Sequence, residues 1–125
     1  MKGKYTLQSE QRALLCAQYA LDKKALDVKI LCISELSSLT DYLVLVSGTS
    51  DRQVQAIAES VRLEHKQHNE LSPIAVEGMK EGRWVLLDYG DVMVHVFQQD
   101  VRSFYDLDGL WSEAPQLPVS EDGAV

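Results

Sequence analysis

The sequence predicts an α/β domain with a mixed β-sheet of about five strands and flanking helices. Three observations support this fold class. The chain has 125 residues, which is the length of one ordinary domain. Its composition, with 46% hydrophobic and 25% charged residues, is that of a folded globular protein. Stretches with helical periodicity alternate with short apolar runs typical of strands.

The first half of the chain contains two expected helices and two expected strands. Residues 8–26 carry apolar side chains at three- and four-residue steps, which indicates a helix. Residues 28–33 form a β-branched and aliphatic run that predicts a strand. Residues 42–47 are apolar on both faces, so we expect a buried central strand there. Capping-box spacing at Ser50 predicts a second helix that ends near Lys66.

The second half is expected to be mainly strands. Residues 74–77 predict a short strand, which a right-handed crossover should place parallel to and beside residues 42–47. Residues 84–88 and 91–97 predict a hairpin, because Tyr89 and Gly90 between them form a two-residue loop.

The C-terminal part combines a short helical piece with a tail. Residues 103–111 have the pattern of an amphipathic helical turn. From Ser112 onward, prolines and acidic residues dominate and apolar periodicity is weak. The sequence therefore predicts one domain over residues 1–111 and a flexible, frayed acidic tail over residues 112–125, which stability should not need.

The net charge and the lengths of the apolar runs restrict the kinds of partner that this chain can bind. The chain has 19 acidic and 12 basic residues, a net charge of −7, which disfavours direct nucleic-acid binding and favours a basic protein partner. The longest unbroken apolar run, residues 43–46, is far shorter than the ~20 residues that cross a bilayer. Without the apolar core of a signal peptide near the N-terminus, the sequence predicts a cytoplasmic protein with no membrane contact.

One face of the predicted hairpin is chemically mixed. Strand alternation puts aliphatic side chains on the other face, which should be buried. With Tyr89–Gly90 as the loop, the opposed pairs on the mixed face are Asp88 with Asp91, Leu86 with Met93 and Trp84 with His95. Such a mixture is typical of a protein interface, although a helix that covers this face would make Trp84 an ordinary core residue.

Catalytic alternatives rest on weaker signals. Asp88 and Asp91 could converge on Mg²⁺, and the helix start at residues 48–50 could hold a phosphate, which together outline a nucleotidyl-transfer site. No Walker lysine and no Asp-x-Asp pair accompany them, so capping explains residues 48–50. We interpret His65 and His68 as solvated residues at a helix end. The sequence predicts no enzyme, no metal and no cofactor.

Several segments resemble the ribosomal silencing factor family, which is also called Iojap-related. Its most specific motif is Gly-Asp-Val-x-Val-His-Val, at residues 90–96. The resemblance covers roughly residues 14–112. The other matching segments are residues 20–28, 40–42, 47–50, 52–54, 77–78, 84, 88–89, 97, 105 and 110–111.

The resemblance implies a fold related to nucleotidyltransferases but without their catalytic carboxylates, and often a homodimer. It also implies a function as a translational repressor. Such a protein binds the fourteenth protein of the large ribosomal subunit, so that the small subunit cannot join when nutrients are short. On this basis we assign partner binding to the motif residues of the mixed face, which are Trp84, Leu86, Asp88, Asp91, Met93 and His95.

Overall fold

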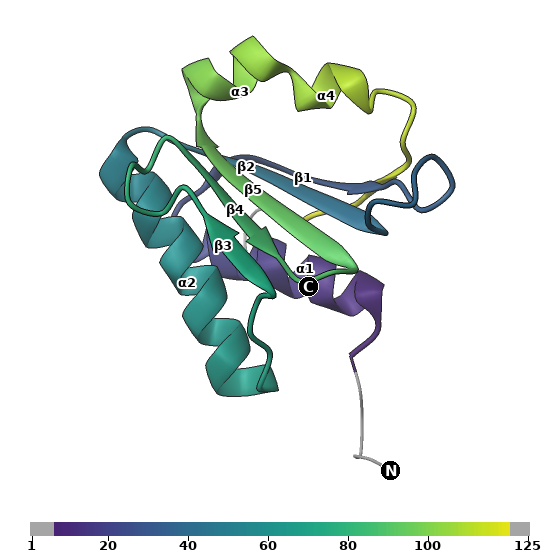
Figure 1. Ribbon diagram of the computed structural model, residues 1–125, viewed down its shortest axis with the longest axis horizontal. Coiled ribbons are helices and arrows are strands. Elements are labelled where there is room, and N and C mark those ends of the chain that lie inside the picture. The colour runs from purple at the N-terminus through teal and green to yellow at the C-terminus, as the bar shows by residue number, and fades with distance from the viewer. Residues whose placement is uncertain (1–6, 121–125) are drawn as a thin grey trace.

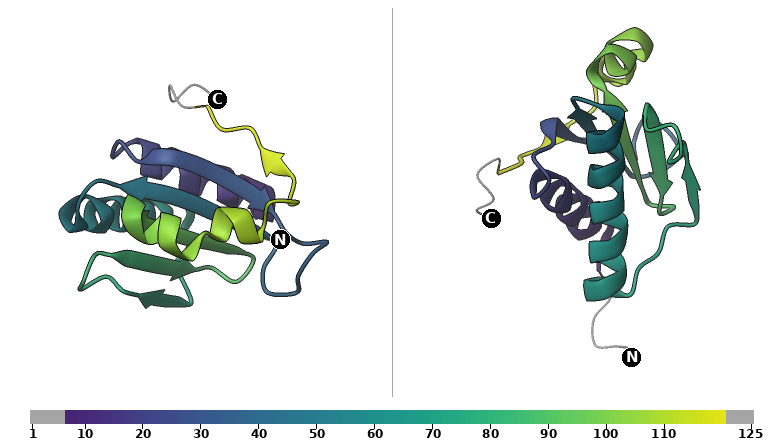
Figure 2. Two further views of the ribbon diagram at one scale, coloured as in Figure 1. Left: turned by 90° about the horizontal axis from the view of Figure 1, so that it is seen from above. Right: turned by 90° about the vertical axis from the view of Figure 1, so that its left-hand side faces the viewer.

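The computed structural model describes residues 7–120, which form three layers with one β-sheet in the middle (Figure 1). Two helices, α1 and α2, cover one face of the sheet, and α3 and α4 lie across the other (Figure 2). This arrangement confirms the predicted single α/β domain with a mixed sheet. The helices are α1 (Ser9–Leu21), α2 (Asp51–Asn69), α3 (Gln99–Tyr105) and α4 (Leu107–Leu110), and the strands are β1 (Leu26–Cys32), β2 (Tyr42–Gly48), β3 (Ala75–Glu77), β4 (Trp84–Asp88), β5 (Val92–Gln98) and β6 (Gln116–Leu117).

The six strands are ordered β3-β4-β5-β2-β1-β6. Only β2 and β5 pair in parallel, and the other neighbours pair antiparallel. The prediction that β3 lies beside β2 is wrong. Helix α2 carries the chain past two strand positions to the edge of the sheet, and the β4–β5 hairpin then fills the gap. Because β5 is buried or half-buried along its whole length, it can occupy a central position next to β2.

The main core lies between the sheet and helices α1 and α2. Strand β2 is buried along its length except at Tyr42, which confirms the predicted central strand. The aliphatic hairpin face is also buried here, and Val85, Leu87 and Val94 are fully inaccessible. At the start of α2, the Ser50 side chain accepts a hydrogen bond from the Gln53 backbone N–H, as the capping pattern predicts.

His65 belongs to this core, which corrects its interpretation as a solvated residue. Helix α2 continues to Asn69, so His65 lies four residues after Val61 on the buried stripe. Its Nε2 is 3.2 Å from the Cys16 Sγ, and its Nδ1 is 3.0 Å from the Asn69 Nδ2. Burial lowers the pKa of His65 to about 4. His68, in contrast, is exposed and lies 3.0 Å from Glu64, as expected at a helix end.

The hairpin register differs from the prediction by two residues. The loop consists of Gly90 and Asp91, and the Tyr89 N–H donates to the Val92 carbonyl across it. Gly90 has a φ of +90°, which glycine adopts without strain, so it takes the first loop position. A shift of two residues keeps every side chain on its predicted face. It pairs Trp84 with Phe97, Leu86 with His95 and Asp88 with Met93.

Residues 112–120 are ordered by the sheet, whereas the sequence predicts a frayed tail. Strand β6 pairs with β1, and the Cys32 N–H donates to the Pro115 carbonyl at 2.8 Å. Ala114 is buried, while Leu117 and Val119 pack against the main core. The sequence pattern does not reveal this strand, because β6 is only two residues long and shows no periodicity. Residues 121–125, the rest of the predicted tail, lie outside the described residues.

Truncation after Ser112 should therefore destabilise the protein. The shortened chain loses the β6 pairing and the apolar contacts of Ala114 and Leu117. We expect the melting temperature to fall by more than about 5 °C in a thermal unfolding scan. A full-length Leu117→Ala variant separates packing from strand pairing and should show a smaller loss. A truncated chain that melts with the intact protein would support a dispensable tail instead.

None of the helices within residues 7–120 is long and apolar enough to cross a membrane.

Candidate functional site

An exposed aromatic cluster lies where the sheet face meets helix α3. The Trp84 ring centroid is 4.8 Å from that of Tyr105, 5.6 Å from that of Phe97 and 5.8 Å from that of His95. Phe104 packs edge-on against Tyr105 and is 79% exposed. Large aromatic side chains are enriched at the centres of protein interfaces. The aromatic cluster, which comprises Trp84, His95, Phe104 and Tyr105 packed around the fully buried Phe97, is therefore the best candidate docking surface.

The sheet and Gly78 fix the position of Trp84. Strand pairing places Trp84 opposite Phe97 and next to His95 on the same face. Gly78 has a φ of +83°, and a Cβ atom there would lie 2.0 Å from the Trp84 carbonyl oxygen. Only glycine allows this turn to approach β4 so closely. The glycine of the Glu77–Gly78 motif thus acts through the backbone that carries Trp84.

Two grooves flank Trp84. The sheet groove has a volume of about 310 Å³ and is lined by Glu77, Gly78, Trp84, Leu86 and His95. The helix groove has a volume of about 560 Å³ and is lined by Arg83, Trp84, Asp100, Val101, Phe104 and Tyr105. Trp84 lines both grooves, so this one side chain could contact partner groups in each of them.

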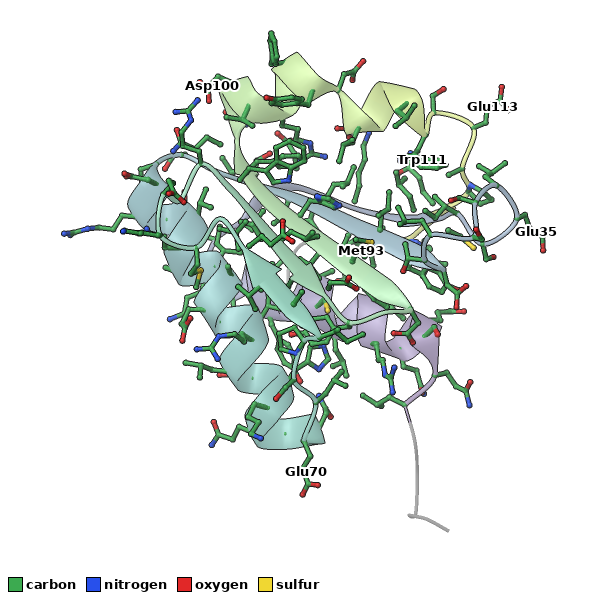
Figure 3. All side chains as sticks on the ribbon, viewed as in Figure 1. Glu35, Glu70, Met93, Asp100, Trp111 and Glu113 are labelled. Atoms are coloured by element: carbon green, nitrogen blue, oxygen red, sulfur yellow. The ribbon has the colours of Figure 1, made fainter. Side chains whose placement is uncertain are left out.

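The structure places five of the six predicted site residues on the mixed face, in three environments. Trp84, Leu86 and His95 line the sheet groove. Met93 faces the same side of the sheet but packs under α3 and α4 against the smaller core, together with Trp111 (Figure 3). The Asp88 Oδ1 accepts a hydrogen bond from the Gly90 N–H at 2.8 Å. Trp84 and Met93 both pack in part against the smaller core, and Trp84 in addition lines two open grooves, so helices α3 and α4 cover the mixed face only in part.

Asp91 lies apart from the mixed face. It is a loop residue, and its Oδ2 accepts hydrogen bonds from Arg12 at 2.9 Å and from Ser9 at 2.6 Å. Both donors belong to α1, on the opposite side of the sheet. The predicted opposition of Asp88 and Asp91 was wrong because the loop begins one residue later. Asp91 joins the hairpin loop to the start of α1.

Replacing Asp91 by asparagine should reduce stability and leave docking nearly intact. The variant loses the ion pair with Arg12, so we expect the free energy of unfolding in urea to fall by about 1–2 kcal/mol. Asp88→Asn is the matched control, because its remaining Oδ1 can still accept from Gly90. That variant should unfold like the wild type. Equal stability of the two variants would contradict the structural role of Asp91.

The geometry gives no support to the nucleotidyl-transfer alternative. Asp88 and Asp91 are bound to different groups of this chain and do not converge. Gln53 accepts from the Thr49 N–H and Ser50 accepts from the Gln53 N–H, so side chains cap the start of α2. Among residues 7–120, no three His, Cys, Asp or Glu side chains gather in a way that could hold a metal ion.

Buried Arg102 holds the α3–α4 arm, the segment of residues 99–110, over the sheet. Its guanidinium donates to both carboxylate oxygens of Asp108 at 3.0 and 2.9 Å, to the Ser47 Oγ at 2.8 Å and to the Asp27 carbonyl at 2.7 Å. It also lies 5.7 Å from the Phe97 ring centroid. These contacts set where Tyr105 and Phe104 stand relative to Trp84.

The ion pair of Arg102 with Asp108 makes the stability of the fold depend on pH. Hydrogen bonds from Arg102 lower the pKa of Asp108 to about 2, below its ordinary value of 3.8. A lowered folded-state pKa stabilises the fold above about pH 4, and this stabilisation is lost as the pH falls towards 2. We expect Asp108→Asn to be less stable than the wild type at pH 6 and the difference to shrink between pH 4 and pH 2. Urea unfolding at several pH values measures the difference in stability between the two proteins. A difference that does not change with pH would contradict the role of Asp108.

Sequence reasoning missed three exposed apolar residues of the arm. Phe104 is 79%, Tyr105 55% and Leu110 68% exposed. The amphipathic pattern of their segment predicts that one side of the helix is buried. The pattern does not tell how much apolar surface remains exposed on the other side. The adjacent Phe104–Tyr105 pair was the available signal, since two neighbouring helical residues cannot both face the same core.

The fold and this surface define a class of protein, namely a small mixed-sheet α/β domain with an aromatic surface that is a candidate for docking. A family model described as "Ribosomal silencing factor during starvation" matches residues 6–124. The chain is 45% identical over 94 residues to Ribosomal silencing factor RsfS of Bacillus subtilis, covering 75% of this chain and 79% of that protein. It is 41% identical over 112 residues to RsfS of Halalkalibacterium halodurans, covering 89% and 95%.

A crystal structure of a Chromobacterium violaceum protein shares the fold. Its TM-score is 0.82 at 36% identity, and the alignment covers 90% of this chain and 91% of that one. The chain therefore belongs to the ribosomal silencing factor family, as its motifs predicted.

Proposed function

We propose that this protein is a translational repressor in the cytoplasm that binds a protein of the large ribosomal subunit, the fourteenth in the usual naming. By occupying that protein it blocks joining of the small subunit and silences translation under nutrient limitation. Family membership and the names of the relatives support the ribosomal target. The exposed aromatic cluster around Trp84 is the observation on this chain that carries the proposal.

We place the docking contact at the sheet groove and the helix groove on both sides of Trp84. Of the predicted residues, Trp84, Leu86 and His95 line the sheet groove, and Asp88 belongs to the same face. Phe104 and Tyr105 extend the surface across the arm. The net charge of −7 suits a basic ribosomal protein, because long-range attraction speeds encounter.

Co-sedimentation with separated ribosomal subunits tests the proposal. The purified protein should pellet with large subunits and not with small ones, and preincubated large subunits should then form fewer complete ribosomes. Equal binding to both subunits, or to neither, would contradict it. Magnesium-dependent incorporation of labelled nucleotide would instead support the transferase alternative. The homodimer that the family resemblance implies stays a prediction, which sedimentation equilibrium of the purified protein measures directly.

A further inference from the structure

His95 carries a hydrogen bond that fixes the proton on its ring. The Trp84 indole Nε1 donates to the His95 Nδ1 at 3.0 Å. An indole nitrogen can only donate, so Nδ1 must be the bare, accepting nitrogen. In a neutral imidazole the proton then resides on Nε2, which becomes a donor. Burial lowers the pKa of His95 to about 4, so the ring is neutral at the pH of a cell.

That donor is open to a partner. No hydrogen-bond acceptor within residues 7–120 contacts the His95 Nε2. An atom without a partner that was also buried would be among Arg12 Nε, Tyr89 OH and Asp91 Oδ1. Nε2 is not among them, so it reaches the surface. The ring lines the sheet groove, so its N–H is available at the surface on which we place docking. This inference rests on that proposed function.

The charge of the groove selects the kind of acceptor. Glu77 is the one charged residue among the five that line it, and no cation lies there to neutralise a second anion. A carboxylate or phosphate would therefore meet repulsion. Trp84 and Leu86 supply apolar walls on which a flat, uncharged group can lie. A main-chain peptide group fits these conditions, since it is planar and neutral and offers a carbonyl oxygen.

We propose that His95 is a specificity-determining residue whose Nε2–H donates to a main-chain carbonyl of the docked protein, with Trp84 holding the ring in the donating tautomer. The pair works as a unit: Trp84 provides the contact area and orients His95, and His95 reads one acceptor. A partner segment without a carbonyl at this place leaves a desolvated donor unpaired, which lowers its affinity.

Two substitutions at this position separate the roles of the ring. In His95→Asn, the side-chain oxygen replaces Nδ1 and still accepts from Trp84, but nothing replaces Nε2. In His95→Gln, the side-chain nitrogen replaces Nε2 and keeps the outward donor, but no acceptor takes the place of Nδ1. If His95 served only to orient Trp84, His95→Asn would bind better than His95→Gln. Our proposal predicts the opposite order.

The experiment measures co-sedimentation of wild type and both variants with large subunits, together with urea unfolding of each. We expect His95→Asn to bind about tenfold more weakly and His95→Gln to stay within about threefold of the wild type. Nitrogen-15 NMR of the free protein should show a protonated Nε2 and a bare Nδ1. The opposite order of affinities, equal affinities or the other tautomer would overturn the inference. A wild type that does not pellet with large subunits would overturn the proposed function itself.

Discussion

Alanine in place of Trp84 is expected to weaken binding to large ribosomal subunits by about thirtyfold or more while the domain stays folded. Truncating an aromatic anchor at the centre of an interface typically costs 2 kcal/mol or more of binding free energy, which corresponds to about this factor. Trp84 lines both the sheet groove and the helix groove and contacts Tyr105 and His95. Its loss removes contact area from both grooves at once.

The stability of the Trp84→Ala variant shows whether Trp84 is a contact residue of the interface or a residue of the core. A fully buried tryptophan truncated to alanine leaves a cavity and costs about 3–5 kcal/mol. Trp84 is half-buried and packs against the smaller core from its rim, so we expect a clearly smaller loss in urea unfolding. Leu63→Ala is the control, because Leu63 is 48% exposed on α2, across the sheet from the aromatic cluster. Unchanged subunit binding, or a loss of stability near the cavity value, would place the docking surface elsewhere.

Much of the fold could be predicted because its elements follow simple periodicities. The buried stripe of α2 has to pack against the sheet, and β2, which is buried on both faces, has to lie in the middle of the sheet between the two helical layers. The neighbours of β3 could not be predicted in the same way, because a crossover rule gives the direction of a strand and not how many strands the helix passes. Strand β6 was invisible since two residues carry no period.

The candidate site shows the same division between local and distant information. Alternation along β4 and β5 identified the face of Trp84, Leu86 and His95, and a two-residue shift of register left that result intact. Asp91 could not be placed, because its partners Arg12 and Ser9 are about eighty residues away in the chain. The contact of Trp84 with His95 was predicted as a directly opposed pair, whereas the two residues meet diagonally across the hairpin, where the indole donates to the imidazole.

Arg102→Met should produce the largest loss of stability of the variants considered, about 3–5 kcal/mol in the free energy of unfolding. Methionine keeps the apolar stem that packs near Phe97 and removes the guanidinium. The change leaves the fully buried Ser47 hydroxyl and the Asp27 carbonyl without their donor, and leaves Asp108 with Lys29 alone. A buried polar group that loses its partner keeps its desolvation cost.

The matched control is Arg83→Met, which removes the same charge from an exposed pair. Arg83 lies 3.5 Å from Asp100, and both side chains are more than half exposed, so its loss should change stability by less than about 1 kcal/mol. Because Arg102 fixes the α3–α4 arm beside Trp84, Arg102→Met should also loosen the Tyr105 contact and weaken subunit binding. Arg102→Lys, which keeps the charge but cannot bridge Asp108, Ser47 and Asp27 together, should recover only part of the stability. Equal unfolding free energies for Arg83→Met and Arg102→Met would show that the arm is held by its apolar contacts and that the guanidinium contributes little.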